Sequence, residues 1–469
     1  MKPAALCLLA LSLSACAVGP DYKQPAFKHG EQWQGEVVAK EVLQASDSTR
    51  IWWQQFDDPL LSEVIEKAAA NNLELAVALA NVERAKAIRQ QAAAGLLPTL
   101  DATGEARRSR YSRQTGFGAN TGTRNSFDAS LDASWEIDLF GGTRRAMQAA
   151  DARIDAVEAA RQGVRLAVIA EVAASYFELR GLQRQLALSR HNIELLAAVE
   201  AIAAAQAELG VSSELDLLRA RGERESVQAG LPDLEARMMA RIFRISVLTG
   251  QAPEVYLATL AQEKPMPVIR DRVPVGLRSE LLKRRPDLLQ AERELAAATA
   301  NIGVVTADLY PGFSLTGSLG SSARLFSDLF TPATLTRSLA GLLNWPLFAG
   351  GALHAAVDVA NAEEKAALAR YEQSILLALE DTESALITYA REWQTLQQLR
   401  AAEASRVEAF EISKLRYEAG EESFLVILDA ERSLMTTRND IISSETRLLT
   451  TLTLLYKSLG GDWQLPAAQ

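Results

Sequence analysis

The chain has 469 residues, a formal net charge of −10 and two cysteines. The negative charge argues against nucleic acid as a partner. Aromatic residues make up only 6% of the chain, and alanine is abundant. This composition suits long helices that pack closely together, and the length alone would allow two or three domains.

The first residues read as a processing signal. Lys2 precedes an apolar run over residues 4–13 that is too short to span a bilayer. The run ends in Leu-Ser-Ala-Cys at residues 13–16, which resembles the bacterial lipobox, whose cysteine receives a diacylglycerol and becomes the new N-terminus. We therefore expect residues 1–15 to be a lipoprotein signal peptide and Cys16 to be the lipid attachment site. An ordinary cleavage site that precedes a cysteine by chance is the alternative.

Residue 17 is Ala rather than Asp, which by resemblance to lipoprotein sorting favours the outer membrane over the inner one. Cys7 lies in the discarded segment, so the mature chain has no free thiol and no disulfide. Two or more acyl chains hold a protein on a membrane stably, whereas one does not. The sequence thus predicts a lipid-anchored protein of the outer membrane.

Ordered landmarks recur in the two halves of the chain. An Ala-rich helical stretch ends near Pro98 in the first half, and another ends near Pro311 in the second. Three later pairs share an offset of 210 residues: 208–210 with 418–420, 218–220 with 428–430, and Gly250 with Gly460. A period of this length is too long for a solenoid repeat and predicts a duplicated supersecondary unit.

Long helices follow a glycine pair in each half. We expect Gly141, Gly142, Gly350 and Gly351 to be the bends where a strand passes to a helix. No proline interrupts residues 142–210, so a continuous helix there would measure about 100 Å. A 3.5-residue seam runs from Val168 to Leu196 and again from Ile375 to Leu396, which predicts coiled-coil packing. The seam alone does not exclude a soluble helical bundle.

Segments between the helices alternate strictly between apolar and polar residues. Residues 126–135 read Ser-Phe-Asp-Ala-Ser-Leu-Asp-Ala-Ser-Trp, and residues 313–319 alternate likewise. The period of two predicts strands with one apolar and one polar face. We expect one hairpin per half, at about 99–137 and about 312–346. Outward apolar and inward polar strands of about ten residues are typical of outer-membrane barrels; a strand pair on a soluble core is the alternative.

Four strands per chain cannot close a barrel around a lumen, and lipid offers no hydrogen-bond partners to the open edges. Several identical chains must therefore share one barrel. Two chains would give eight strands and a filled interior, whereas three would give twelve strands and leave a pore. The predicted fold is mainly α with a membrane β-barrel: a duplicated helix–hairpin–long-helix unit whose trimeric twelve-stranded barrel continues as an α-helical coiled-coil tube.

Several motifs spread along the chain resemble those of one family, the outer-membrane efflux factors or TolC-like proteins. The resemblance is to their lipoprotein branch, the NodT-type efflux lipoproteins that serve resistance–nodulation–division (RND) pumps, and it covers essentially the whole mature chain. The residues that carry it are Cys16–Tyr22 with Pro25, Trp52-Trp53, Phe56, Asp58–Leu60, Arg284–Leu288, Ala307–Pro311, Phe313–Gly317, Tyr417–Gly420 and Leu428–Ala430.

The resemblance implies a homotrimer with a barrel, a helical tube and an equatorial belt. It also implies docking to a periplasmic adaptor (membrane fusion) protein and an inner-membrane RND transporter. The expected location is the outer membrane, with the lipid anchor there and the helices extending into the periplasm. The expected divisions are 16–58 (N-terminal extended or equatorial segment), 59–250 (first repeat), 251–278 (linker or equatorial segment), 279–461 (second repeat) and 462–469 (C-terminal tail).

The resemblance also implies a gate at the periplasmic end of the tube. Asp429 matches a position where family members place a carboxylate that faces the pore. Three such carboxylates would gather on the trimer axis, repel one another and attract cations. Leu425, on the same helical face, would form an apolar constriction, and Tyr417 and Arg416 would hold the closed state by a hydrogen bond or an ion pair. A solvated surface carboxylate is the alternative for Asp429.

The resulting functional prediction is a passive exit duct for drugs or other small solutes in a tripartite efflux system, and not an enzyme. We expect no cofactor and no metal site, since His29, His191 and His354 lie far apart in the sequence. A structural coiled-coil tether, and a duct for metal cations or for protein secretion, are the alternatives. Trp52 and Trp53 are either membrane-interface anchors or buried under the helices. The exported substrate depends on the inner-membrane partner, which the sequence does not identify.

Overall fold

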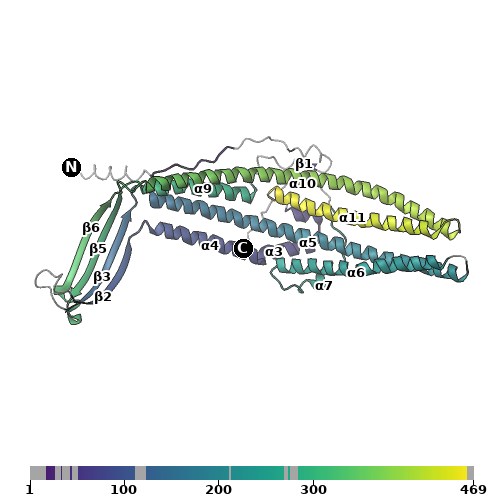
Figure 1. The fold of residues 1–469 in the computed structure, drawn as a ribbon, viewed down its shortest axis with the longest axis horizontal. Coiled ribbons are helices and arrows are strands. Elements are labelled where there is room, and N and C mark those ends of the chain that lie inside the picture. The colour runs from purple at the N-terminus through teal and green to yellow at the C-terminus, as the bar shows by residue number, and fades with distance from the viewer. Residues whose placement is uncertain are drawn as a thin grey trace. The chain divides into compact units, whose positions relative to one another are not determined.

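In the computed structural model, most of the chain forms long helices and a four-stranded sheet (Figure 1). Two compact units emerge, each built from separate stretches of sequence: residues 1–26, 81–158 and 290–372 form the first, and 27–80, 159–289 and 373–469 the second. The described residues are 17–26, 33, 43–44, 51–110, 123–210, 213–268, 273–274 and 284–461. Cys16, the signal peptide expected at 1–15 and the tail expected at 462–469 lie outside them.

The duplication appears as pairs of equally long helices. The shorter pair, of 22 residues each, is α4 (Leu73–Ala94) and α9 (Pro286–Ala307). The two 67-residue helices are α5 (Gly142–Glu208) and α10 (Ala352–Glu418), and the two 35-residue helices are α6 (Glu214–Leu248) and α11 (Phe424–Ser458). Both long pairs are displaced by 210 residues, which confirms the duplicated unit.

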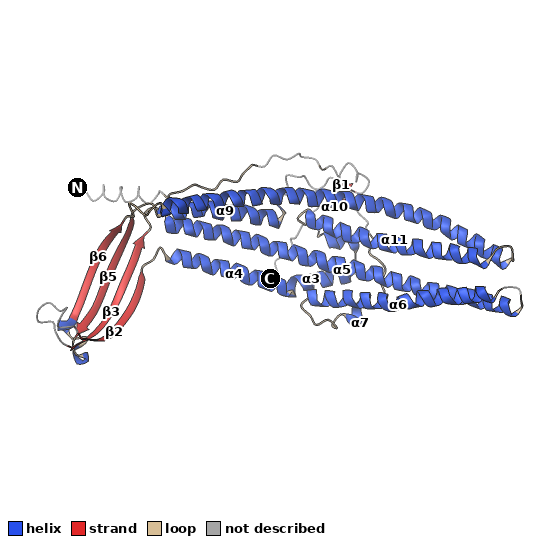
Figure 2. Cartoon of the chain, viewed as in Figure 1, coloured by secondary structure: helices blue, strands red, loops and turns tan. Residues whose placement is uncertain are grey.

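The first unit contains one antiparallel sheet of four strands in the order β2-β3-β5-β6 (Figure 2). The strands are β2 (Thr99–Arg110), β3 (Thr123–Ile137), β5 (Gly312–Ala323) and β6 (Leu335–Asn344). The predicted two hairpins are thus present and are joined through β3 and β5. Among the described residues, β2 and β6 each pair along one side only, so both outer edges of the sheet lack a partner in one chain.

The strand register assigns every side chain to one of two faces. Ala102, Leu131, Leu319 and Arg337 stand in one cross-strand row, and the rows of the same face are mainly apolar. Asp101, Asp132, Ser318 and Ser338 form a neighbouring row on the opposite face, which is polar. The alternation seen in the sequence therefore extends across all four strands.

The strand-to-helix bends contain glycines in the left-handed region. Gly141 has φ of +82°, and Gly350 and Gly351 have φ of +59° and +86°. Gly142 instead begins α5 with an ordinary helical conformation. The Nε1 atoms of Trp135 and Trp345 donate to Leu96 and Leu309, 3.0 and 3.1 Å away. The two repeats thus close their bends with matching tryptophan contacts.

The second unit has a helical core that begins with a short 3-10 helix, η1 (Trp52–Phe56), and with α3 (Pro59–Asn71). Asp58 caps α3 by accepting from the backbone N–H groups of Leu60 and Leu61. Trp52 and Trp53 are 4% and 1% exposed, and Trp52 stacks on Tyr456 at 5.2 Å between ring centroids. Their role is therefore burial under the helices rather than anchoring at a membrane interface.

The predicted seam of α5 is buried in the same unit. Val168, Val172 and Leu179 are at most 1% exposed, and the second seam buries Ile375, Leu386 and Tyr389 on α10 to the same degree. Within the described part of the chain, no helix is both apolar and long enough to cross a membrane. The remaining described elements are short: α7 (Leu257–Leu260), η2 (Phe326–Asp328), η3 (Pro332–Thr334), and the paired two-residue strands β1 (Leu43–Gln44) and β4 (Val273–Pro274).

Gly250 follows α6 at a close backbone contact with the end of α3. Its φ is +72°, and an added Cβ would lie 2.3 Å from the carbonyl oxygen of Asn71. Gly210 has a similar φ of +69° but has nothing within 4 Å of such a Cβ. A side chain at Gly210 would therefore add backbone strain alone, whereas a side chain at Gly250 would add both backbone strain and steric overlap.

We expect Gly250→Ala to lower the free energy of unfolding by roughly 2–5 kcal/mol, because left-handed strain of about 1–2 kcal/mol adds to overpacking of about 1–3 kcal/mol. Gly210→Ala should cost only the strain. Thermal unfolding of the purified protein, followed by circular dichroism, measures both. Equal losses in the two variants would show that the contact with Asn71 does not constrain the fold.

Candidate functional site

The residues predicted to form a gate lie where the long helices turn back in the second unit. α10 ends at Glu418 and α11 begins at Phe424. Gly420, with φ of +75°, ends α10 in a Schellman motif: its N–H donates to the Tyr417 carbonyl at 3.0 Å, and the Glu421 N–H donates to the Arg416 carbonyl at 2.9 Å. Gly210, with φ of +69°, stands at the corresponding end of α5, and its N–H donates to the Ala207 carbonyl at 3.0 Å.

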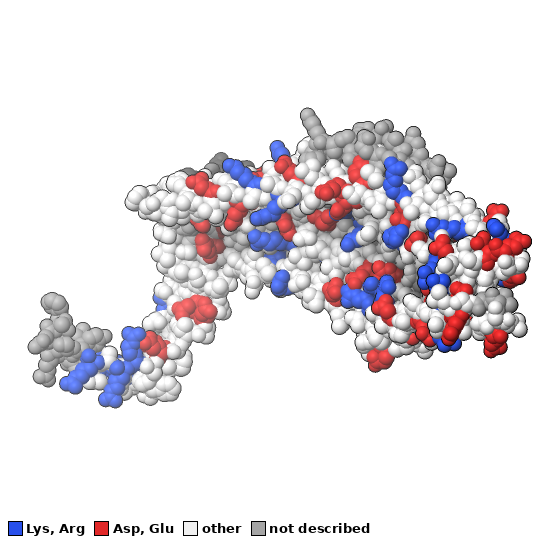
Figure 3. All heavy atoms as spheres, turned by 45° about the vertical axis from the view of Figure 1, so that its right-hand side comes forward, with Lys and Arg blue, Asp and Glu red and all other residues white. Residues whose placement is uncertain are grey.

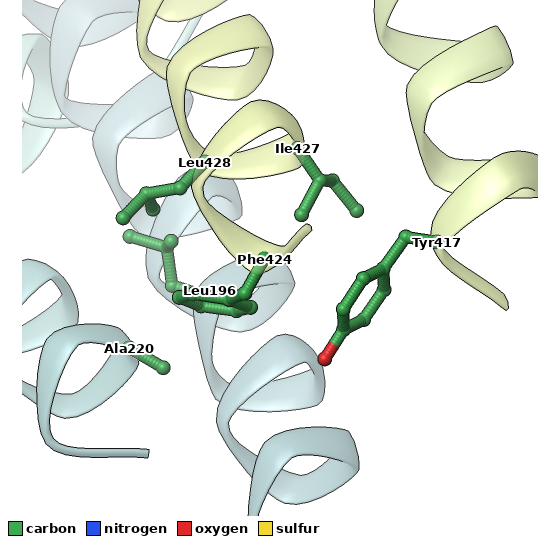
Figure 4. Close-up of a cluster of buried hydrophobic side chains, with 6 residues drawn as sticks. All are labelled: Leu196, Ala220, Tyr417, Phe424, Ile427 and Leu428. Carbon is green, nitrogen blue, oxygen red and sulfur yellow. The ribbon is translucent and has the colours of Figure 1, made fainter. Parts of the chain in front are cut away.

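A buried apolar cluster joins four helices next to this turn. α5, α6 and α10 each contribute one side chain and α11 contributes three, and all six are less than 10% exposed (Figure 4). We call these residues the tip cluster: Leu196, Ala220, Tyr417, Phe424, Ile427 and Leu428. Because apolar burial stabilises by about 25 cal/mol per Å², separating α11 from α5 and α6 would expose this cluster at a substantial cost.

Tyr417 connects the tip cluster to α5 through a polar contact. Its ring packs edge-on against Phe424 at 5.9 Å between centroids, and its hydroxyl donates to Gln206 Oε1 at 2.8 Å. Burial raises the pKa of Tyr417, and the charge of Asp216 raises it further. The hydroxyl therefore stays a neutral donor, and it ties α10 to α5 across 211 residues of sequence.

Arg416 makes a weaker contact. Its guanidinium lies 3.7 Å from Glu422, within the turn between α10 and α11. Both side chains are partly exposed, and exposed ion pairs contribute about 0–1 kcal/mol. Arg416 thus braces its own turn, whereas Tyr417 reaches the other repeat.

Leu425 and Asp429 lie on a different side of α11 from the buried cluster. Leu425 is 50% exposed, and Asp429, one helical turn later, is exposed as well. Their neighbours Ile427 and Leu428 are buried. The structure therefore places a carboxylate and an apolar side chain together on a free surface of α11, apart from the tip cluster.

Ion pairs hold α11 and α5 to α6 around the cluster. Arg432 on α11 pairs with Glu223 on α6. Glu200 on α5 accepts from Arg221 at 3.0 Å and from Arg224 at 2.7 Å, and these two arginines lower its pKa. Each helix of this end of the unit is thereby connected to its neighbour by polar as well as apolar contacts.

Glu431 is a buried carboxyl that the sequence analysis missed. It is 4% exposed, and neither of its oxygens accepts a hydrogen bond. Burial raises its pKa to about 7, and the charge of Glu223 contributes, while Asn192 and Arg432 act in the opposite direction. The Oδ1 atom of Asn192 is also buried without a partner. A buried carboxyl on α11 thus lies beside Asn192 of α5 and Glu223 of α6.

A signal for Glu431 was present in the sequence. The buried positions of α11 follow a three-four spacing, and Glu431 is the one ionisable residue among the first six of them. These positions are Phe424, Ile427, Leu428, Glu431, Leu434 and Met435. A charged residue in an apolar seam predicts either a partner across the interface or a raised pKa.

The raised pKa of Glu431 predicts that packing at the tip depends on pH. An acid whose pKa is higher in the folded state costs nothing below its ordinary pKa near 4.5, and its cost grows until the pH passes about 7. Glu431→Gln should therefore stabilise the tip at pH 8, by roughly 2–4 kcal/mol, and leave it nearly unchanged at pH 4.5. Hydrogen exchange over residues 424–435, compared between variant and native chain at each pH, measures the difference.

Glu418→Gln, which changes an exposed carboxylate at the end of α10, is the control and should have little effect at either pH. An equal gain from Glu431→Gln at both pH values would mean that the side chain is not ionised at pH 8 and that the change acts through packing alone.

Comparison with known proteins identifies the architecture. A family model described as outer membrane efflux protein matches residues 64–251 and 277–461. The chain is 36% identical to the pyoverdine export outer membrane protein OpmQ of Pseudomonas putida, over 98% of each chain. It is 32% identical to nodulation protein T of Rhizobium leguminosarum, over 91% of this chain and 90% of that protein.

Solved structures show the same fold. The outer-membrane channel OprN superposes with a TM-score of 0.89 at 34% identity, covering 95% of this chain and 99% of that one. The open state of the MtrE outer membrane channel of Neisseria gonorrhoeae gives 0.83 at 28% identity, covering 95% and 98%. These neighbours are trimeric TolC-family channels with a barrel and a helical tube, so the predicted fold class is confirmed. The chain belongs to the outer membrane efflux protein family and is an outer-membrane exit channel of tripartite efflux systems.

Proposed function

We propose that three copies of this chain form a passive duct for drugs or other small solutes. The observation that carries the proposal is the sheet, which has one apolar face, one polar face and two edges that pair with no other described strand. Joining β2 of one copy to β6 of the next satisfies both edges. Twelve strands then enclose a pore lined by the polar face.

The partners of this duct are, we infer, a periplasmic adaptor protein and an inner-membrane RND transporter. Similar relatives bear the names of different cargoes: an antibiotic efflux pump protein of Pseudomonas putida, ArpC, and a toluene efflux pump protein of the same species, TtgC, are each 30% identical to this chain. Relatives with one channel architecture are thus named for several substrates. This supports a channel that conducts passively and a transporter that selects the substrate.

Asp429 and Leu425 form, in this proposal, the constriction at the periplasmic end of the tube. Both lie on the free surface of α11, so three copies can bring them to a common axis. Tyr417 and Arg416 hold the closed arrangement, Tyr417 by its bond to Gln206 and Arg416 by bracing the turn at Glu422. Opening then requires α10 and α11 to move against α5 and α6, which the tip cluster resists.

The first repeat (59–250) and the second (279–461) are, in this view, the two arms of each chain's share of the tube. Gly141 and Gly142, with Gly350 and Gly351, mark where the strands end and the long helices begin. These bends let a sheet and a helix bundle follow one another in a single wall.

Cys16 is proposed as the lipid anchor. The residues that follow it lie against the first bend, because the Val18 N–H donates to the Phe140 carbonyl at 3.0 Å and Arg145 donates to the Val18 carbonyl at 2.9 Å. An acyl group attached ahead of Ala17 would therefore start near the end of the strands that adjoins the helices. In the proposed duct, the periplasmic surface of the outer membrane is expected there.

Asp429→Ala should make the channel open more often in planar bilayers. A smaller, uncharged side chain widens the ring and releases the cations that three carboxylates attract. A change of about 1 kcal/mol corresponds to a roughly fivefold rise in open probability. Single-channel recording of the purified protein measures it.

Asp233→Ala serves as the matched control, since Asp233 is an exposed carboxylate on α6 that pairs with Arg237 at 3.7 Å. Its open probability should equal that of the native chain. A protein with no conductance at all would be a tether rather than a duct, and an Asp429→Ala variant with unchanged gating would remove Asp429 from the constriction.

Cys16→Ala should yield a protein without covalent lipid. We expect the native chain purified from membranes to be heavier than residues 16–469 by at least two acyl chains, and the variant to lack this mass. Intact-protein mass spectrometry gives the answer. A native chain of unmodified mass beginning at residue 16 would refute the anchor without affecting the duct.

A further inference from the structure

An apolar groove lies on the outward face of the sheet near its loop end. The segment between β5 and β6 folds back over the strands: Phe330 N–H donates to Ser321 Oγ at 3.1 Å, Ser321 donates to Thr334 Oγ1 at 2.7 Å, and the rings of Phe127 and Phe326 pack at 5.7 Å. The volume between the segment and the strands is about 630 Å³, which is in the range of ligand pockets.

The strand register shows that the groove belongs to the apolar face. Leu131 pairs with Leu319 and with Ala102, and Ser321 pairs with Ala129 and Leu335, so these side chains all share one face. Its main lining consists of Ala102, Ala129, Leu131, Leu319, Phe330 and Leu335. Phe330 has φ of +75°, a conformation rare for an aromatic residue, and it lies 77% exposed at the groove. Strain of this kind is typical of ligand-binding segments.

Arg337, Arg108 and Arg110 stand on the same face as the groove. Arg337 pairs directly with Leu319, and Arg108, on β2, is two residues beyond Ala106, which pairs with Phe127. Neither has a carboxylate partner within the described residues. By contrast, Arg107 on the opposite face pairs with Glu105 at 2.6 Å. Among the described residues, Arg107 thus has a carboxylate partner, whereas Arg108 and Arg337 have none.

An unpaired arginine on a lipid-facing surface is costly near the middle of a membrane and tolerable near its surface. The other ends of all four strands lead into helices, so the loop end of the sheet faces away from the periplasm. Basic side chains gather on this end of the sheet in the space-filling view (Figure 3). Arginine binds phosphate by paired hydrogen bonds, so phosphate groups of the outer leaflet are the complementary partners.

We propose that each chain binds one phosphorylated glycolipid of the lipid A class, with an acyl chain in the groove and phosphates on Arg337 and Arg108. This rests on the proposed function, which places the apolar face in the outer membrane. The two arginines belong to opposite outer strands of the sheet, so one phosphate cannot serve both. A head group with two phosphates fits the pair better than a phospholipid with one.

Native mass spectrometry of the purified trimer with added lipid A tests the proposal. We expect up to three bound lipids, and at least about tenfold weaker binding in the double variant R108Q/R337Q. Ala129→Trp, which fills the groove, should weaken binding to a similar extent. Arg107→Gln is the matched control: it removes the neighbouring charge on the opposite face and should leave the affinity unchanged.

Three outcomes would overturn the site. Unchanged affinity in R108Q/R337Q would show that the two arginines do not bind the lipid. An equal loss of affinity in R107Q would show that only the net charge matters. Dephosphorylated lipid A or phosphatidylglycerol binding as tightly as lipid A would show that the two phosphates are not recognised. Conductance of the same sample separates this proposal from the duct: a conducting trimer that fails to bind lipid A refutes the lipid site alone, whereas absence of conductance refutes the duct.

Discussion

The unpaired backbone groups along β2 and β6 are the constraint on which the rest of the structure depends. In hydrocarbon, each unsatisfied N–H or C=O group costs several kcal/mol, and the described part of a single chain leaves the outer edges of β2 and β6 without a partner. Copies of the chain have to pair edge to edge for this sheet to enter a membrane. Once they do, the polar face is enclosed and the apolar face meets lipid.

The duplication also gives the helices of the second unit a regular arrangement. α5 matches α10 in length and α6 matches α11, and the tip cluster takes side chains from all four helices. The repeats nevertheless differ where they meet. Leu428 is buried in the cluster, whereas its counterpart Leu218 is 53% exposed, and Asp429 corresponds to Arg219, which contacts Asp216 at 3.5 Å. The two repeats thus have equivalent helices but different side chains at corresponding positions.

Periodic patterns made most of the fold predictable from the sequence. The alternation at 126–135 and the seam from Val168 to Leu196 each show which side chains share one apolar face. The period of such a face distinguishes a strand from a helix and predicts which side is buried. The contact of Tyr417 with Gln206 and the groove under Phe330 were not predictable in this way, because both depend on how distant segments fold back. Glu431 was overlooked for another reason: a single carboxylate does not disturb a strong apolar pattern.

Glu431 also gives the tip of the helices a property that an apolar seam would lack. The tip cluster favours close packing of α11 at every pH, since its members do not ionise below the range of tyrosine. Glu431 opposes that packing only when it loses its proton, and with a pKa of about 7 it does so near neutrality. The two contributions act on the same helix from adjacent turns. The free energy that favours packed over separated helices is therefore smaller at neutral pH than the burial of Phe424 and Leu428 alone would give.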